Sequence, residues 1–191
     1  MLARNRPVLE VRPLALEGVC EISPLRRGDA RGFLSEVWSE RAMAAAGLSF
    51  AFVQENHSYS AARGVLRGLH FQKEPAAQDK LIRVVRGSIF DVAVDIRRAS
   101  PTFGKWIGII VSAQAWNQIL IPRGLAHGFV TLEAETEVQY KLSAPYRPDL
   151  AGAIRFDDPD IAIDWPVPPQ QLQLSESDRS APLLAAIDPG F

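Results

Sequence analysis

Three side chains that can carry a positive charge lie close together in an apolar stretch of the chain. Residues 64–72 (GVLRGLHFQ) place Arg67 and His70 among core-type residues, and Lys80 follows soon after. Histidine exchanges a proton near neutral pH, while arginine and lysine bind anions. The group therefore indicates a site where an anionic substrate undergoes proton transfer. A solvated strand at the edge of a sheet explains the same residues equally well.

Short apolar segments, separated by turns rich in glycine and proline, must position these residues. Two short strands are expected within residues 8–22, then a turn at 27–32 and a strand at 33–38. Ser39 is expected to cap a helix that runs to about Ala46 and ends at Gly47. Many short strands and almost no helix predict an all-β sandwich or barrel. Its other strands are expected at residues 50–58, 64–72, 80–85, 88–96, 106–112, 117–121, 126–132 and 136–142.

The size and composition of the chain suit one domain. It has 191 residues, of which 47% are hydrophobic and 23% are charged, as in an ordinary globular protein. We expect a single domain over residues 1–191, in which the tail at 154–191 packs on the barrel. In that tail, apolar residues are scattered among aspartates and prolines, and we expect a polar turn at 175–178 and a short helix at 182–186.

Charge and cysteine content narrow the possible partners. The net charge of -1 provides no overall attraction to nucleic acid or to an anionic membrane, so any cationic site is local. Cys20 is the only cysteine, which excludes an internal disulfide and a cysteine-based zinc site. Residues 1–10 lack the apolar run of a signal peptide, and no segment is apolar enough to span a bilayer. We therefore expect a cytoplasmic protein without nucleic-acid or membrane partners.

Two of the three histidines stand in a recognisable sequence frame. Gly64 and His70 have G-x5-H spacing, and Pro122 and His127 belong to a P-x-G-x2-H segment. These frames resemble the two motifs of the cupin superfamily, whose fold is a jelly-roll β-barrel. Metal-binding cupins carry a second histidine two residues after the first, where this chain has Gln72. The resemblance therefore implies a jelly roll without a catalytic metal, because too few ligands remain.

Within the cupins, the chain resembles the dTDP-4-dehydrorhamnose 3,5-epimerase family from Arg27 to about Asp178. The match runs in order through residues 29–36 (DARGFLSE), 54–58 (QENHS), 64–72 (GVLRGLHFQ), 78–81 (QDKL), 91–97 (DVAVDIR), 100–106 (SPTFGKW) and 121–129 (IPRGLAHGF). The resemblance implies a cofactor-independent epimerase that inverts C3 and C5 of a dTDP-4-keto-6-deoxyhexose through an enolate. Such an enzyme serves deoxysugar biosynthesis of the dTDP-rhamnose type. Family members are homodimers in which N-terminal strands pack across to the partner, so we expect a homodimer.

The resemblance implies a catalytic role for four residues. His70 matches the base that removes the hydrogens acidified by the C4 ketone, and Asp178 matches the carboxylate that orients its imidazole. Lys80 would stabilise the enolate oxygen at C4, and Tyr140 would return a proton from the opposite face, as inversion requires. Without the resemblance, these residues read as a core histidine, a surface aspartate, a solvated lysine and a packed barrel tyrosine.

Six further residues match positions that contact the substrate. Arg31 and Arg67 would bind the diphosphate or sugar oxygens, for which a planar guanidinium is suited. The others, which would contact the base or the sugar, are Glu36, Gln54, Asn56 and His127. Outside the family context, these would be ordinary polar residues of a barrel that pair with its backbone.

The chain departs from the family pattern toward the nucleotide end of the site. Ser177 stands where the family usually has a lysine, which Arg179 could replace, and Ala151 stands where it usually has a glutamate. A tyrosine pair of the family corresponds to Pro145-Tyr146. These departures leave the acid–base residues intact but leave the identity of the nucleotide open.

Several alternative functions remain open. A mono-epimerase at C3 or C5, a keto-isomerase of the same fold, or an epimerase of another nucleotide-linked 4-keto sugar would use the same residues. A metal-dependent cupin oxygenase needs the second histidine that the chain lacks. A non-catalytic sugar-binding cupin does not need His70 and Tyr140 as a base and an acid on opposite faces of a sugar.

Overall fold

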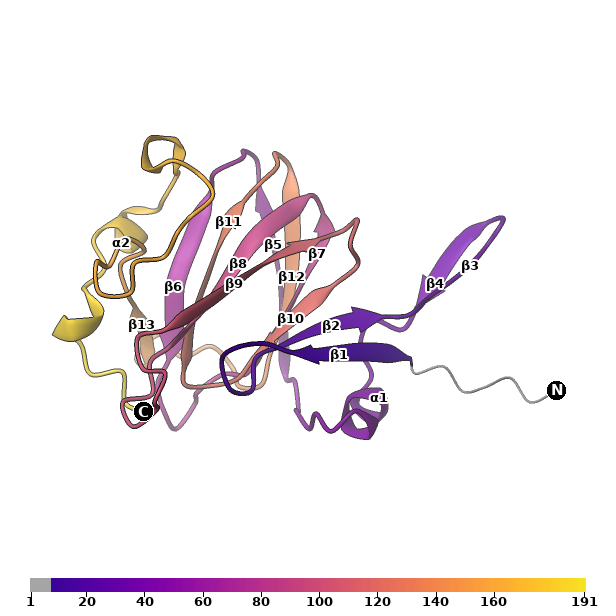
Figure 1. Ribbon diagram of the computed structural model, residues 1–191, viewed down its shortest axis with the longest axis horizontal. Helices are drawn as coiled ribbons and strands as arrows, with labels where there is room; N and C mark the ends of the chain where they lie inside the picture. Colours follow the sequence, from indigo (N-terminus) through magenta and orange to yellow (C-terminus); the bar gives the residue numbers. More distant parts are fainter. Residues whose placement is uncertain (1–7) are drawn as a thin grey trace.

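Two β-sheets that face each other form the body of the molecule, as the computed structural model of residues 8–191 shows (Figure 1). The strand order is β1-β2-β10-β7-β12-β5 in the six-stranded sheet and β13-β6-β11-β8-β9 in the five-stranded sheet. From β5 onward the chain passes repeatedly between the two sheets, and neighbouring strands are antiparallel. The all-β prediction is confirmed, and this alternation is typical of a jelly roll.

The strands are short and mostly begin and end where the sequence predicts. Their bounds are β1 Leu9–Pro13, β2 Cys20–Pro24, β3 Arg26–Asp29, β4 Gly32–Ser35, β5 Gln54–Ser60, β6 Leu66–Gln72, β7 Lys80–Arg86, β8 Ser88–Asp95, β9 Trp106–Ser112, β10 Gln118–Ile121, β11 Leu125–Thr131, β12 Thr136–Leu142 and β13 Ala151–Ala153. The helical segments are α1 Glu40–Ala45, α2 Glu176–Arg179, and the 3-10 turns Pro169–Gln171 and Leu184–Ala186.

Apolar side chains from both sheets fill the space between them. Because successive side chains of a strand point to opposite faces, every second residue of these strands enters this barrel interior. The interior includes Ile82 and Val84 of β7, Val138 of β12, Ile89 and Ala93 of β8, and Leu125 and Phe129 of β11. A polar residue at the same phase of one of these strands is therefore held inside the barrel.

The C-terminal segment covers the outer face of the five-stranded sheet. Val92 and Val94 of β8 pack there against Ile154, Ile161 and Leu184 of the tail. This second layer explains why β8 is buried on both faces and reads as an almost continuous apolar run. The same segment brings α2 beside β6 (Figure 1).

Helix α1 and the β3–β4 hairpin lie between β2 and β5 in the chain. The Ser39 hydroxyl accepts a hydrogen bond from the Ala42 N–H at 3.4 Å, and Gly47 has a positive φ of 81° just after the helix, so the predicted helix is confirmed. The hairpin projects away from both sheets (Figure 1). Its Phe33 and Leu34 are 51% and 76% exposed.

Four local predictions were wrong, and one of them is the polar turn expected at residues 175–178, where Ser175 caps helix α2 instead. Residues 27–32, predicted as a turn, form most of a hairpin, and the strand predicted at 33–38 ends at Ser35. The strand predicted from residue 50 begins at Gln54, because Phe50 and Phe52 pack near α1 instead of entering the sheet. Strand β13 was not predicted, since three small residues carry no alternating pattern.

Part of the segment in which no signal peptide was expected, residues 1–7, lies outside the described residues. From residue 8 onward, no helix is long and apolar enough to cross a bilayer.

Candidate active site

His70 and Asp178 meet although they are far apart in the sequence. The Nε2 atom of His70 on β6 lies 2.6 Å from Oδ1 of Asp178 on α2. Ser175 caps α2 by accepting a hydrogen bond from the Asp178 N–H at 3.1 Å, which fixes where the aspartate stands. The side chain of His70 is 50% exposed and that of Asp178 only 6%. One ring nitrogen of His70 therefore contacts a buried carboxylate, while the other side of the imidazole is accessible to a bound molecule.

The charge of Asp178 is maintained by its partners. Burial alone would raise the pKa of Asp178, but hydrogen bonds from His70, from Ser175 and from the main chain of Gly68 hold it below the usual value. A charged carboxylate accepts the Nε2–H of His70, which leaves Nδ1 as the ring nitrogen free to take a proton. This arrangement suits a general base.

Lys80 lies at the start of β7, in phase with the buried Ile82 and Val84, so its side chain enters the barrel interior. The residue is 7% exposed, and its Nζ donates to the main-chain oxygen of His70 at 3.0 Å. Burial lowers the pKa of Lys80 to about 8, and the carboxylate of Asp91 opposes this shift. A buried ammonium thus lies next to the strand that carries the base.

His127 is the direct cross-strand neighbour of His70. It belongs to β11, in phase with the core residues Leu125 and Phe129, and is 9% exposed. Residues directly opposite each other in antiparallel strands have Cβ atoms about 5 Å apart on one face. The two histidines therefore point to the same region of the barrel.

Asp91 is a site residue to which the sequence motifs assigned no role. Its Oδ2 atom lies 2.9 Å from Nε2 of His127, and the residue is completely buried. The available signal was a charged residue in the middle of the apolar run 89–94. Only the register of β8 against β11 connects that charge to His127.

Tyr140 faces the site from the opposite sheet. It lies on β12 in phase with Val138, and its ring packs against the barrel core. Its strand neighbours are Asn56 of β5 and Ile82 of β7. Because His70 belongs to the five-stranded sheet and Tyr140 to the six-stranded sheet, a base and an acid approach the barrel interior from two sides.

Polar residues of β5 and β6 surround this group. The side-chain amide of Gln54 donates to Oδ1 of Asn56 at 3.0 Å and accepts from the main-chain N–H of Tyr146 at 2.9 Å. Arg67 is exposed, and its guanidinium donates to the main-chain oxygen of Tyr59 at 3.2 Å. These residues offer hydrogen bonds and one exposed positive charge to a bound molecule.

Arg31 and Glu36 lie apart from the other predicted site residues of the same chain. Arg31 lies at the turn of the β3–β4 hairpin, where its side chain is 90% exposed and pairs with Asp29 at 2.6 Å. Glu36 follows β4 and is also exposed. Since the hairpin projects away from the barrel (Figure 1), Arg31 does not reach His70 within one chain.

The positions that depart from the family pattern are mostly exposed. Ser177 and Arg179 lie on the outside of α2, and Ala151 begins β13 opposite Gln72. Tyr146 is 59% exposed. The loop that carries it is fixed at its base, because the Gln72 side chain accepts from the Arg147 N–H at 2.8 Å.

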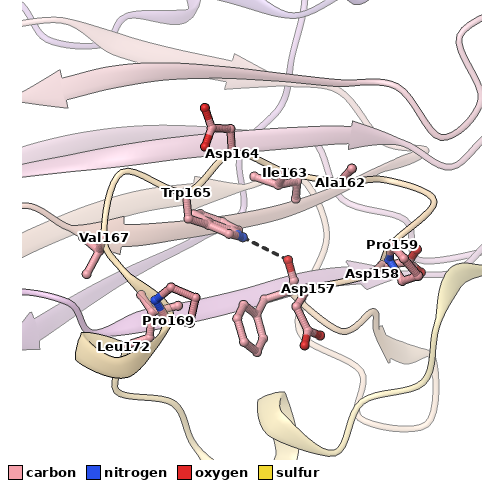
Figure 2. Close-up of a pocket in the computed structure, with 11 residues that line it drawn as sticks. Asp157, Asp158, Pro159, Ala162, Ile163, Asp164, Trp165, Val167, Pro169 and Leu172 are labelled. Atoms are coloured by element: carbon pink, nitrogen blue, oxygen red, sulfur yellow. Dashed lines mark hydrogen bonds between the residues drawn. The ribbon is translucent and has the colours of Figure 1, made fainter.

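A cavity of about 310 Å³ opens elsewhere, within the C-terminal segment (Figure 2). The indole of Trp165 lies across it and donates to the main-chain oxygen of Phe156 at 2.9 Å. None of its lining residues is a predicted site residue; they are Phe156, Asp157, Asp158, Pro159, Ala162, Ile163, Asp164, Trp165, Val167, Pro169 and Leu172.

Metal-ligating side chains do not gather in the described part of the chain. Among residues 8–191, no group of three or more His, Cys, Asp and Glu side chains is arranged to hold a metal ion.

The chain is similar to proteins of known family over most of its length. A family model described as dTDP-4-dehydrorhamnose 3,5-epimerase matches residues 13–186. A protein of that name from Sinorhizobium fredii is 44% identical over 178 residues, which cover 93% of this chain and 91% of the relative. Another from Pseudomonas aeruginosa is 47% identical over 176 residues, covering 92% and 96%.

Solved structures are similar in the same way. The dTDP-4-dehydrorhamnose 3,5-epimerase of Bacillus anthracis, with TDP and PPi bound, superposes with a TM-score of 0.88 at 43% identity, covering 92% of this chain and 99% of that one. The Legionella pneumophila dTDP-6-deoxy-D-glucose-3,5-epimerase, in complex with dTDP-4-keto-L-rhamnose, gives 0.88 at 43% identity, covering 94% and 95%. A 3'-monoepimerase from Streptomyces bikiniensis, in complex with dTDP-quinovose, gives 0.83 at 34% identity, covering 91% and 87%.

Proposed function

The chain belongs to the dTDP-4-dehydrorhamnose 3,5-epimerase family, and we propose that His70, Asp178, Lys80 and Tyr140 carry the reaction of that family here. The protein is an isomerase that epimerises a sugar in dTDP-rhamnose biosynthesis. The observation that carries the residue assignment is the 2.6 Å contact of His70 with a buried carboxylate, across the barrel from Tyr140.

The first step is removal of a proton next to the ketone. Nδ1 of His70 takes the hydrogen from C3 or C5, and the electron pair of that C–H bond moves to form the enolate at C4. The ammonium of Lys80 stabilises the negative oxygen, and Asp178 stabilises the imidazolium. A buried ammonium acts strongly on the enolate because little water screens it.

The second step returns a proton to the other face of the ring. Tyr140 donates its hydroxyl proton to the same carbon, the C4 ketone re-forms, and the configuration is inverted. The tyrosinate recovers a proton and the imidazolium loses one before the next turnover, so the cycle is balanced. Neither step requires a cofactor or a metal.

Binding groups fit a nucleotide-linked substrate. Arg67 is the exposed cation beside His70 and suits a diphosphate, while Gln54, Asn56 and His127 supply hydrogen bonds for the sugar or base. The structural relatives whose names include dTDP, TDP or a dTDP-sugar support a dTDP-linked 4-keto-6-deoxyhexose as substrate.

A homodimer completes this proposal. Arg31 and Glu36 match substrate-contacting positions of the family, yet Arg31 lies on a hairpin that projects away from its own barrel, and Glu36 follows directly after that hairpin. The hairpin also exposes Phe33 and Leu34, and exposed apolar side chains favour association. We infer that the hairpin of one copy reaches the site of the other, and that residues 1–191 work as one cytoplasmic domain.

The number of centres inverted is settled by solvent exchange. The purified protein is incubated with dTDP-4-keto-6-deoxyglucose in deuterated water, and C3 and C5 are followed by NMR. Deuterium and inversion at both carbons are expected. Labelling at one carbon alone would identify a mono-epimerase, the activity named for the similar Streptomyces bikiniensis protein, and absence of labelling would contradict the proposed reaction.

A further inference from the structure

A carboxylate with an incomplete set of hydrogen bonds is buried next to the catalytic group. Asp91 on β8 is completely buried, and its Oδ2 lies 2.9 Å from Nε2 of His127. Its Oδ1 has no hydrogen-bond partner among the residues that the structure describes. Burying a carboxylate in this way is costly, and an apolar residue would pack the position at lower cost. A specific partner in the site is needed to account for it.

Lys80 is the charge that Asp91 acts on. Its Nζ is buried and donates to the main-chain oxygen of His70, although an ammonium has three hydrogens to donate. The two residues approach the barrel interior from different sheets, and the electrostatic effect of Asp91 favours the charged form of Lys80. The buried negative charge therefore has a buried positive counterpart.

Among residues 8–191, the other buried carboxylates, those of Asp79, Asp95, Asp158 and Asp178, have charged or main-chain partners of their own. Asp178 is already committed to His70. The titratable and charged groups that face this region are Arg67 and His70 of β6, Lys80 of β7, His127 of β11, Tyr140 of β12 and Asp178 of α2. All but Asp178 are cationic or neutral, so Asp91 is the buried negative charge that acts on Lys80 from the facing sheet.

We propose that Asp91 is a positioning residue that keeps Lys80 protonated for enolate stabilisation and holds His127 with its Nε2–H turned away from the substrate. The inference rests on the proposed function, because it assigns a role within the same site. With Nε2–H donated to Asp91, Nδ1 of His127 is the nitrogen that can accept a hydrogen bond from a sugar hydroxyl.

Removing the charge of Asp91 has a definite consequence for Lys80. Burial already lowers the pKa of Lys80 to about 8 while Asp91 opposes the shift. Without that opposition the pKa falls further, toward neutral pH, and a growing fraction of Lys80 is uncharged where the enzyme works. An uncharged amine stabilises an enolate far less than an ammonium does.

The test replaces Asp91 by a neutral residue of the same shape. In Asp91→Asn, the amide oxygen still accepts from Nε2–H of His127, so mainly the charge is lost. The chain contains four lysines, Lys73, Lys80, Lys105 and Lys141, so isotope-labelled lysine side chains give few NMR signals, and Lys80→Arg assigns that of Lys80. We expect the Lys80 titration to move down by about one pH unit or more, and the basic limb of kcat/KM to move with it.

A matched control separates charge from stability. Asp95→Asn removes the other fully buried carboxylate of β8, whose partners are Arg97, Ser100 and Thr102. We expect that variant to lose stability without moving the Lys80 titration. If Asp91→Asn does not fold, Asp91→Ser removes the same charge with a smaller side chain and carries the same expectation.

The outcomes distinguish this inference from the proposed function. An unchanged Lys80 titration in a folded neutral variant, or a pH profile that is lowered but parallel to wild type, would overturn the role of Asp91. The NMR titration needs no turnover. If Lys80 shifts as expected but the wild-type protein labels no 4-keto sugar, the electrostatic pairing stands and the epimerase mechanism fails.

Discussion

At the scale of single residues, the site consists of a base on a buried carboxylate, a buried ammonium and a tyrosine across the barrel. The sequence identifies His70 and Lys80 as candidates because these two polar residues stand within apolar strands. Asp178 could not be distinguished from an ordinary surface aspartate without the family resemblance, because its burial depends on how the tail folds back on β6. The sequence shows Asp91 as a charged residue within an apolar run. Its partner His127 can be identified only from the register of β8 against β11.

The carboxylate behind the base gives one prediction. In Asp178→Asn, the side-chain volume is kept, but the charge that stabilises the imidazolium is lost and the His70 tautomer is no longer fixed. We expect kcat to fall by about 10²-fold or more, with a smaller change in KM. Steady-state kinetics and a thermal melt of the variant check this. A kcat within a few-fold of wild type would remove Asp178 from the mechanism.

The tyrosine gives a second prediction. Tyr140→Phe removes only the hydroxyl, so deprotonation by His70 continues while return of a proton from the opposite face slows. Net epimerisation should therefore drop more than the exchange of substrate hydrogen for deuterium. The two rates are measured in one NMR experiment. Equal losses of both would argue against a reprotonation role for Tyr140.

The pH dependence follows from Lys80. Because the pKa of Lys80 is about 8 in the folded chain, its ammonium is lost as the pH rises through that value, and kcat/KM should fall on the alkaline side. The unfolded chain, with a pKa nearer 10.5, binds more protons between these two values, so this group makes the free energy of unfolding rise with pH there. The pH profile of kcat/KM for the wild type and Lys80→Met checks the first sign, and denaturant unfolding of both proteins over the same pH range checks the second. An alkaline limb retained unchanged in Lys80→Met would contradict the assignment.

At the scale of elements, close contact between β6 and β11 sets His70 opposite His127. Most barrel strands were predictable from alternation and turn residues, and β9 and β12 match their predicted bounds. The exceptions have tertiary causes. Phe50 is apolar but packs near α1, and β13 is stabilised by its position at the edge beside β6 rather than by its own side chains.

Gly68 tests that contact. A Cβ there would lie 2.6 Å from the Cα of Gly128 and from the main-chain oxygen of His127, and the residue has a positive φ of 115°. Gly68→Ala should therefore push the two strands apart and lower both stability and activity. Gly47→Ala is the control, since its Cβ meets nothing within 4 Å and only the positive φ is strained, costing about 1 kcal/mol. Equal melting temperatures for the two variants would contradict the proposed strand contact.

At the scale of the whole molecule, the jelly roll and the family were both predictable and are confirmed. The family could be identified because its motifs occur in the same order along most of the chain. The assembly is different, because a hairpin such as β3–β4 shows only that apolar side chains such as Leu34 stay exposed within one chain. The homodimer therefore stays a prediction.

Mixing two inactive variants tests the dimer. Arg31→Ala lacks the hairpin arginine and His70→Ala lacks the base, so a mixed dimer contains one site with both residues if the hairpin acts on its partner. Random exchange of subunits should restore roughly a quarter of the wild-type rate, since half the dimers are mixed and half their sites are intact. Sedimentation confirms the dimer. No recovery despite proven exchange would mean that Arg31 serves its own chain or none.

The central claim, that His70 removes the proton, is tested most directly by solvent exchange in His70→Ala. The variant and the wild type are incubated with dTDP-4-keto-6-deoxyglucose in deuterated water, and NMR follows C3 and C5. The wild type should introduce deuterium at these carbons, and folded His70→Ala should introduce none above the uncatalysed rate. Exchange at the wild-type rate in the variant would contradict the assignment of the base.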